Sequence, residues 1–159
     1  MSINFSIDNQ LDKSNFKEYK IGIVKSEWNN HITDSLINSC MNFLLDSGIE
    51  ENNIIKINVP GSMELVLGAD LLLNKKKVDG VIALGSIIKG DTDHDKYIAQ
   101  SVSNGLINLS LEYKKPVVFG VLTTNNMKQA IDRCDGKKGN KGLESAYTLL
   151  KMLNLRKEL

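Results

Sequence analysis

The segment "GVIALGS", residues 80–86, is the strongest indication of the fold, because it is almost continuously apolar and runs directly into a polar loop. Three other short runs have the same character: "KIGIVKS" (20–26), "NIIKINV" (53–59) and "PVVFGVLT" (116–123). Near-continuous apolar strands are typical of a sheet that is covered on both faces. A segment with helical spacing follows each run, so the alternation predicts a parallel sheet.

The helical segments are recognised by apolar residues that recur three or four positions apart. Their markers are Leu36, Cys40, Phe43 and Leu44, then Leu65, Val66, Ala69, Leu72 and Leu73, then Ile98, Val102, Leu106 and Leu109, and finally Leu143, Ala146, Tyr147, Leu150 and Leu153. Gly48 can end the first helix, and a shorter helix is expected over residues 126–134. These elements predict a three-layer α/β/α sandwich with a mainly four-stranded parallel sheet.

The length of 159 residues fits one domain of ordinary size. We expect residues 1–19 to form an N-terminal arm, with a short strand around Phe5 and Ile7, and residues 20–159 to form a single domain. The arm is too polar for a signal peptide, and no run approaches the ~20 apolar residues of a membrane span. A soluble, cytoplasmic protein with no membrane partner is the expectation.

Charge and cysteine content narrow the class further. The 20 Lys and Arg residues nearly balance the 19 Asp and Glu residues, and the resulting net charge of +1 provides no field for gathering nucleic acid. Cys40 and Cys134 stand alone, without the paired spacing of zinc ligands, so buried or idle thiols are expected.

Ligands of open parallel α/β sheets bind outside the carboxyl ends of the strands, so the segments that follow the strands are the candidate site. Trp28 follows the first strand, where its ring could stack on a flat heterocycle or close the edge of the core. Gly61 lets the backbone approach a ligand closely, but capping of the second helix by Ser62, with Glu64 in its first turn, is the favoured interpretation of that segment.

The segment "GSIIKGDTDHDKYI" (85–98) follows the third strand. Its acidic residues and His94 resemble metal ligands, but their spacing completes neither a calcium loop nor a zinc site, so no metal is expected. The run Gly90–Asp91–Thr92 precedes a helix, where free backbone N–H groups favour an anion such as phosphate. His94 could transfer protons or could simply be solvated, and the residues alone leave both roles open.

Four motifs occur together in one order: "VPGSMEL", "LGSIIKGDTDHD", "VVFGVLTTNNMKQAIDR" and "GNKGLESA". On these motifs the chain resembles the lumazine synthase family over roughly residues 20 to 155. The resemblance implies a flavodoxin-like fold and a transferase without any cofactor. The implied reaction condenses 5-amino-6-(D-ribitylamino)uracil with 3,4-dihydroxy-2-butanone 4-phosphate to 6,7-dimethyl-8-ribityllumazine, releasing phosphate and water, in the penultimate step of riboflavin biosynthesis.

The resemblance also implies a role for each matching residue. His94 would be the catalytic residue. The substrate-binding residues would be Trp28, Gly61, Ser62, Met63, Glu64, Ser86, Ile87, Ile88, Phe119 and Lys141, and the phosphate-binding residues would be Gly90, Asp91, Thr92 and Arg133. In the family, a neighbouring subunit supplies the equivalents of Phe119, Arg133 and Lys141. Trp28 stands where phenylalanine is commonest, Lys89 where arginine is frequent and Asp95 where an aromatic residue is frequent.

The same resemblance implies small-molecule substrates and self-association into pentamers with sites at the subunit interfaces. The short connection "CDGKKGNKG" (134–142) is similar to that of the shell-forming members, so we expect a sixty-subunit shell, with the pentamer as the alternative, and riboflavin synthase as a candidate partner. Two other functions stay open: a flavin-binding electron-transfer protein on the same fold, and a shell-forming relative without turnover.

Overall fold

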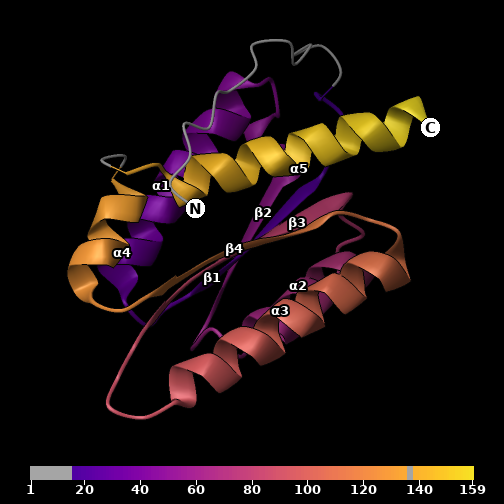
Figure 1. Cartoon of the computed structure of the whole chain (residues 1–159). Coiled ribbons are helices and arrows are strands. Elements are labelled where there is room, and N and C mark those ends of the chain that lie inside the picture. Colours follow the sequence, from indigo (N-terminus) through magenta and orange to yellow (C-terminus); the bar gives the residue numbers. More distant parts are fainter. Residues whose placement is uncertain (1–15, 136–137) are drawn as a thin grey trace.

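The computed structural model describes residues 16–135 and 138–159. Within them the chain forms one sheet with helices packed on both faces (Figure 1). The strand expected around Phe5 and Ile7 lies outside the described residues. Among the residues that are described, no helix is long and apolar enough to cross a membrane.

The sheet consists of β1 (Ile21–Ser26), β2 (Ile54–Val59), β3 (Gly80–Ile88) and β4 (Val117–Thr124). Its strand order is β2-β1-β3-β4, and every neighbouring pair is parallel. β3 lies between β1 and β4 and is buried along its length up to Ile87. The parallel four-stranded sheet predicted from the apolar runs is therefore confirmed.

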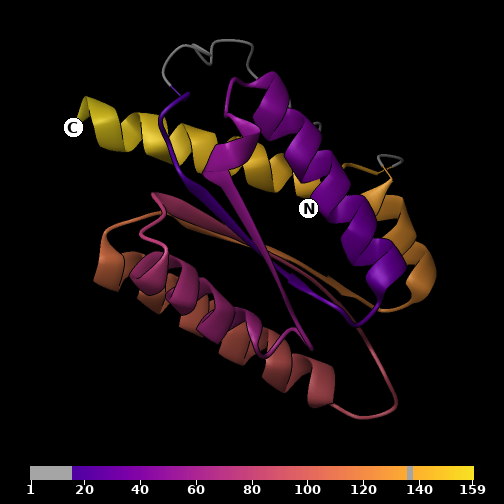
Figure 2. The ribbon, with the colours of Figure 1, turned by 180° about the vertical axis from the view of Figure 1, so that it is seen from behind.

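In the described part of the chain, five α-helices form the outer layers. α1 (Asn30–Asp46), α4 (Met127–Cys134) and α5 (Lys141–Glu158) cover one face, and α2 (Leu65–Lys75) and α3 (His94–Tyr113) cover the other, as Figures 1 and 2 show. A short 3-10 helix, η2 (Glu51–Asn53), precedes β2.

Each face of the sheet has its own hydrophobic cluster, because side chains alternate along a strand. Ile82 and Leu84 pack under α1 and α5, whereas Val81 and Ala83 pack against α2 and α3. This arrangement is the expected α/β/α sandwich. Phe16, which precedes β1, is also buried in the cluster under α1 and α5.

The helix ends follow simple backbone chemistry. Gly48, which follows the cap residue Ser47 of α1, has a φ of 94°, the conformation that ends a helix and that glycine adopts without strain. α4 and α5 each begin after an asparagine whose side chain accepts a hydrogen bond from the first turn: Asn126 from the Gln129 N–H (3.0 Å) and Asn140 from the Leu143 N–H (3.2 Å).

Both cysteines are buried free thiols, as expected. Burial raises the pKa of the Cys40 thiol to about 12, because the thiolate would lose its hydration. The thiol is therefore protonated at neutral pH and chemically idle.

The start of α5 lies unusually close to α1. A Cβ atom added at Gly142 would lie 2.1 Å from the backbone oxygen of Leu36. The Asn140 side chain secures the same contact, since its Nδ2 donates a hydrogen bond to Ser39 Oγ at 2.8 Å. Glycine at position 142 thus permits two helix backbones to touch.

We expect Gly142→Ala to lower the free energy of unfolding by about 1–3 kcal/mol, because α5 must move away from α1. Alanine is the better helix former by about 0.5–1 kcal/mol, so a loss of stability isolates the steric effect. Urea denaturation of both proteins measures it. Gly90→Ala is the control, because an added Cβ there meets nothing within 4 Å. Equal stability of wild type and Gly142→Ala would contradict the contact.

Candidate functional site

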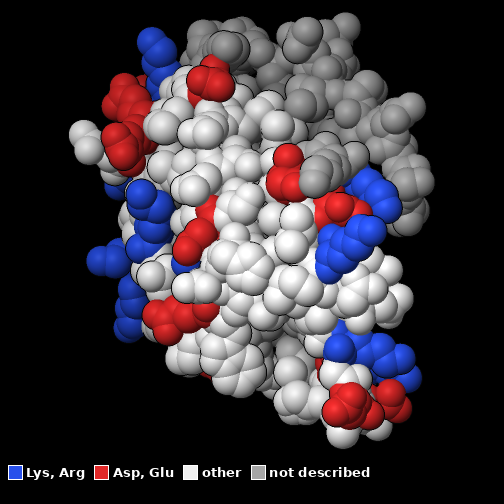
Figure 3. All heavy atoms as spheres, turned by 90° about the vertical axis from the view of Figure 1, so that its left-hand side faces the viewer, with Lys and Arg blue, Asp and Glu red and all other residues white. Residues whose placement is uncertain are grey.

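The carboxyl ends of all four strands lie on one side of the molecule, which is the left of Figure 1. Figure 3 views this side directly: its middle is made mainly of uncharged residues, and Lys and Arg side chains gather toward its two sides. A cavity of about 490 Å³ lies here, at the ends of β1, β2 and β3 and the start of α3. Its lining residues are Trp28, Asn29, Gly61, Ser62, Met63, Glu64, Ser86, Ile87, Ile88, His94, Asp95, Tyr97, Ile98 and Ser101.

Trp28 stands in the mouth of the cavity rather than in the core. Its backbone N–H donates to the Pro60 carbonyl at 3.2 Å, which joins the end of β1 to the end of β2. The indole is 69% exposed, so it does not close the core edge. A Cβ atom added at Gly61 would lie 3.8 Å from the indole, an ordinary contact, and 2.9 Å from Glu64 Oε2, so glycine there leaves room for the Glu64 carboxylate. Of the two roles that the residues left open, this exposure argues against closure of the core, and stacking on a ligand stays a prediction.

Asn29 holds the loop after Trp28 in place. It has a φ of 57°, a left-handed conformation that asparagine tolerates better than most residues. Its Nδ2 donates to the Ser86 carbonyl at 2.9 Å, across to β3. This bond ties the segment that carries Trp28 to the central strand, and the sequence pattern did not predict it.

The expected cap of α2 by Ser62 is wrong. α2 starts one residue after Glu64, and no side chain caps it; the Leu65 N–H donates instead to the Ser62 carbonyl at 3.2 Å. Ser62 is buried with its Oγ toward β3, where a Cβ added at Gly85 would lie 2.9 Å from it. Glu64 Oε2 accepts a hydrogen bond from the Gly61 N–H at 2.9 Å. Both side chains therefore shape the cavity floor.

The end of β3 and one row of α3 form the opposite wall. Ser86 is only 4% exposed, and its hydroxyl has no hydrogen-bond partner in the described part of the chain. His94 is the first residue of α3, and Ile98 and Ser101 follow it at helical spacing along the cavity. Tyr97, Ile98 and Ser101 were not predicted as site residues. Their helical spacing from His94 is the sequence signal that could have identified them.

Gly90, Asp91 and Thr92 are exposed in the loop between β3 and α3, directly before the helix that His94 begins. They are not among the cavity-lining residues. The loop starts from a fixed point, because the Lys89 N–H donates to the Thr124 carbonyl of β4 at 2.8 Å. The backbone around Gly90 is open, so an anion can approach it.

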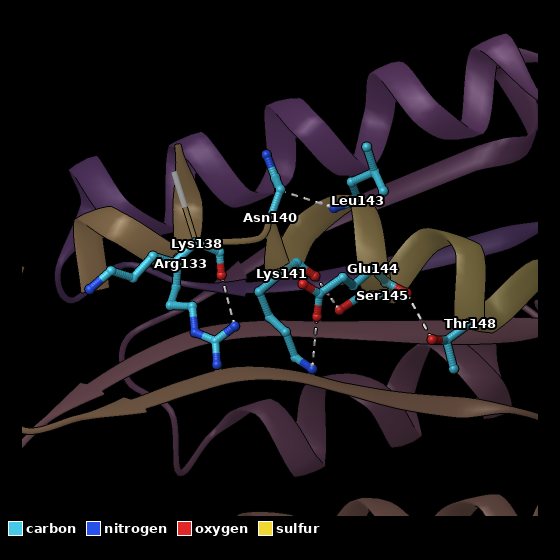
Figure 4. A network of polar contacts seen from close by, with 8 residues as sticks. All are labelled: Arg133, Lys138, Asn140, Lys141, Leu143, Glu144, Ser145 and Thr148. Atoms are coloured by element: carbon cyan, nitrogen blue, oxygen red, sulfur yellow. Dashed lines mark hydrogen bonds and ion pairs between the residues drawn. The ribbon is translucent and has the colours of Figure 1, made fainter. Parts of the chain in front are cut away.

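The structure does not bring Phe119, Arg133 or Lys141 into this cavity. Phe119 and Lys141 line a smaller hollow of about 270 Å³ beside β4, the edge strand. The Arg133 Nη1 donates to the Lys138 carbonyl at 2.9 Å, and the Lys141 Nζ lies 3.7 Å from Glu144 Oε2. Figure 4 shows both cationic side chains extending the same way, away from α1 and toward the edge of the sheet.

The cationic side chains near the site thus lie apart from the larger cavity. Neither lysine nor arginine lines the larger cavity among the described residues, whereas the hollow beside β4 includes Lys141. A cavity with apolar walls, an exposed aromatic ring and a few polar groups suits a flat neutral ligand. Within residues 16–135 and 138–159 no group of three or more His, Cys, Asp or Glu side chains is arranged to hold a metal ion.

The fold and the cavity define a class: a flavodoxin-like α/β protein with a candidate ligand site at the carboxyl edge of its sheet. The family model described as 6,7-dimethyl-8-ribityllumazine synthase matches residues 18–157. The chain belongs to this family.

Curated relatives with this name agree with the assignment. The protein of Cytophaga hutchinsonii is 51% identical over 87% of this chain and 87% of its own length. The Porphyromonas gingivalis protein is 45% identical, covering 89% and 88%, and the Flavobacterium johnsoniae protein is 43% identical, covering 91% and 76%.

Trp28 is the chain's single tryptophan, so its emission reports on this cavity alone. We expect a pyrimidine substrate or product analogue to quench that emission on binding, because the heterocycle stacks on the ring. Trp28→Phe should bind almost as well as wild type, whereas Trp28→Ala should weaken binding about tenfold. Titration calorimetry on the two variants measures the affinities. Unchanged emission at saturating ligand would remove Trp28 from the site.

Proposed function

We propose that this chain catalyses the reaction for which its family is named, the condensation of 5-amino-6-(D-ribitylamino)uracil with 3,4-dihydroxy-2-butanone 4-phosphate to 6,7-dimethyl-8-ribityllumazine. The observation that carries the proposal is the cavity that has the exposed Trp28 on one wall and His94 on another, in a chain of this family. A flat ring with a hydroxylated chain fits a cavity of about 490 Å³ that serine side chains and Glu64 help to line.

The two substrates differ in charge, and the site offers them different surroundings. The pyrimidine is neutral and rich in N–H and hydroxyl donors, so it binds in the cavity. The ketone carries a phosphate, which is bound by the backbone N–H groups of Gly90, Asp91 and Thr92 and by the guanidinium of Arg133. Asp91 is exposed, so its carboxylate can turn away from the bound anion.

His94 is the proton carrier in this proposal. The amine of the pyrimidine attacks the ketone carbon, and loss of water leaves a C=N bond. Loss of a proton from the adjacent carbon then expels phosphate and leaves an enol. The enol takes up a proton at its terminal carbon to become a ketone, and the second nitrogen attacks that ketone and closes the ring with loss of another water. His94 accepts and returns protons in these steps. Holding the two reactants in register contributes the larger part of the acceleration.

Product fluorescence from purified protein and both substrates tests the proposal. A fluorescent lumazine that forms faster than in a protein-free control supports it. Absence of product would favour a shell-forming relative without turnover. A yellow protein with a flavin spectrum and no turnover would favour the electron-transfer alternative.

We expect His94→Ala to lower kcat by about tenfold to a hundredfold, because assisted proton transfer is lost while the ring and phosphate contacts remain. The affinity for the pyrimidine, measured by quenching of Trp28, should change little. His31→Ala is the matched control: it replaces the only other histidine, which is exposed on α1 and does not line the cavity. Equal kcat values for the two variants would exclude proton transfer by His94.

We also propose that the complete site forms between subunits. Phe119, Arg133 and Lys141 are separated from the cavity in one chain, so a second copy must contribute them. Leu67 on α2 and Leu111 on α3 are more than half exposed, which suits an apolar face buried against a neighbour. A closed ring of five subunits gives five equivalent sites, and assembly of such rings into a shell is the further step that we propose.

Co-expression of His94→Ala with Arg133→Ala tests the shared site. In randomly mixed rings about one quarter of the sites receive an intact His94 and an intact Arg133 from different chains, so activity should rise well above that of either variant alone. Separately purified variants, combined without subunit exchange, are the control. No gain in mixed rings, or full activity in a monomer of 17.7 kDa by light scattering, would overturn the shared site. The same scattering measurement distinguishes a pentamer from a shell.

A further inference from the structure

Asp95 lines the cavity, but the reaction described above leaves it without a role. It lies on the inward row of α3, three residues before Ile98 and seven before the fully buried Val102. Its Oδ1 is inaccessible to solvent and has no hydrogen-bond partner among the residues that the structure describes. A carboxylate oxygen is thus held, unpartnered, on a helix row that is otherwise apolar.

The neighbouring charged groups do not satisfy this oxygen. The Lys96 Nζ pairs with Asp93 Oδ1 at 2.9 Å. Glu64, the other carboxylate of the cavity, differs from Asp95 because its Oε2 already accepts the Gly61 N–H at 2.9 Å. Asp95 is therefore the cavity carboxylate that has an acceptor oxygen without a hydrogen-bond partner in the described structure.

A buried acceptor without a partner destabilises the folded protein. A rotation of the Asp95 side chain into the cavity that it lines would let a ligand donor reach this oxygen and recover the lost interaction. The two substrates differ in what they can offer. The pyrimidine presents N–H and hydroxyl donors and no charge, but the phosphorylated ketone presents a dianion that a carboxylate repels. An acceptor at this position discriminates between them.

We propose that Asp95 is a specificity-determining residue of this site, whose Oδ1 accepts a hydrogen bond from an N–H or hydroxyl donor of the pyrimidine substrate and disfavours the phosphorylated substrate in the same cavity. The inference rests on the proposed function and adds the selection between the two substrates to it.

The test compares Asp95→Leu, which removes the acceptor and keeps the branched shape of the side chain, with Asp95→Asn, which keeps a neutral acceptor oxygen. Asp95→Leu should raise the KM for the pyrimidine about tenfold to a hundredfold, with a change of about twofold or less in the KM for the phosphorylated ketone, and Asp95→Asn should fall between it and wild type. The Tm of ligand-free Asp95→Leu, at matched protein concentration, should rise, because an unpartnered buried acceptor is gone. Asp93→Asn is the control, since Asp93 is exposed and does not line the cavity.

The outcomes separate this inference from the proposed function. A fall in Tm for Asp95→Leu would show that Asp95 has a structural partner and would overturn the inference, as would an equal rise in both KM values or an unchanged KM for the pyrimidine. If Asp95→Leu does not fold, the KM values of Asp95→Asn decide alone. If wild type makes no lumazine, the proposed function fails, and quenching of Trp28 by the pyrimidine still measures whether Asp95→Asn weakens its binding.

Discussion

Parallel pairing of a buried central strand is the constraint on which the rest of this molecule depends. β3 bonds to β1 on one side and to β4 on the other, and its side chains alternate between two hydrophobic clusters. Parallel strands must all leave the sheet at the same edge, so Trp28, Gly61, Ser86 and the loop before His94 meet there although they are distant in sequence. The site is a consequence of strand direction.

Backbone contacts beyond the strand ends keep this meeting point rigid. The end of β1 stays bonded to the end of β2 through the Trp28 N–H, and the end of β3 stays bonded to β4 through the Lys89 N–H. The Asn29 side chain adds a third connection to Ser86. Because these bonds are present without a ligand, substrate binding needs little further ordering of the site. Such preorganisation suits a reaction in which positioning contributes most of the acceleration.

In the shared site that we propose, the distribution of charge makes one chain alone incomplete. The cavity has acidic and uncharged lining residues apart from His94, whereas Arg133 and Lys141 extend beside the edge strand (Figure 4). In that proposal, separation of the cations from the cavity keeps the neutral and the phosphorylated substrate apart until a neighbouring subunit brings the two surfaces together. The proposed role of Asp95 adds to this selection from inside the cavity.

The sequence alone determined the elements and much of the site. Apolar runs located each strand to within about two residues, because near-continuous burial demands such runs. Motif residues such as Trp28 and His94 were expected at strand ends and do line the cavity. Ser62 faces β3 instead of capping α2 because of tertiary packing, since a favourable local cap competes with packing against Gly85. Tertiary structure also decided which residues of α3 share the cavity, and it left the Asp95 oxygen without a partner, because burial and partnership depend on neighbours far away in the chain.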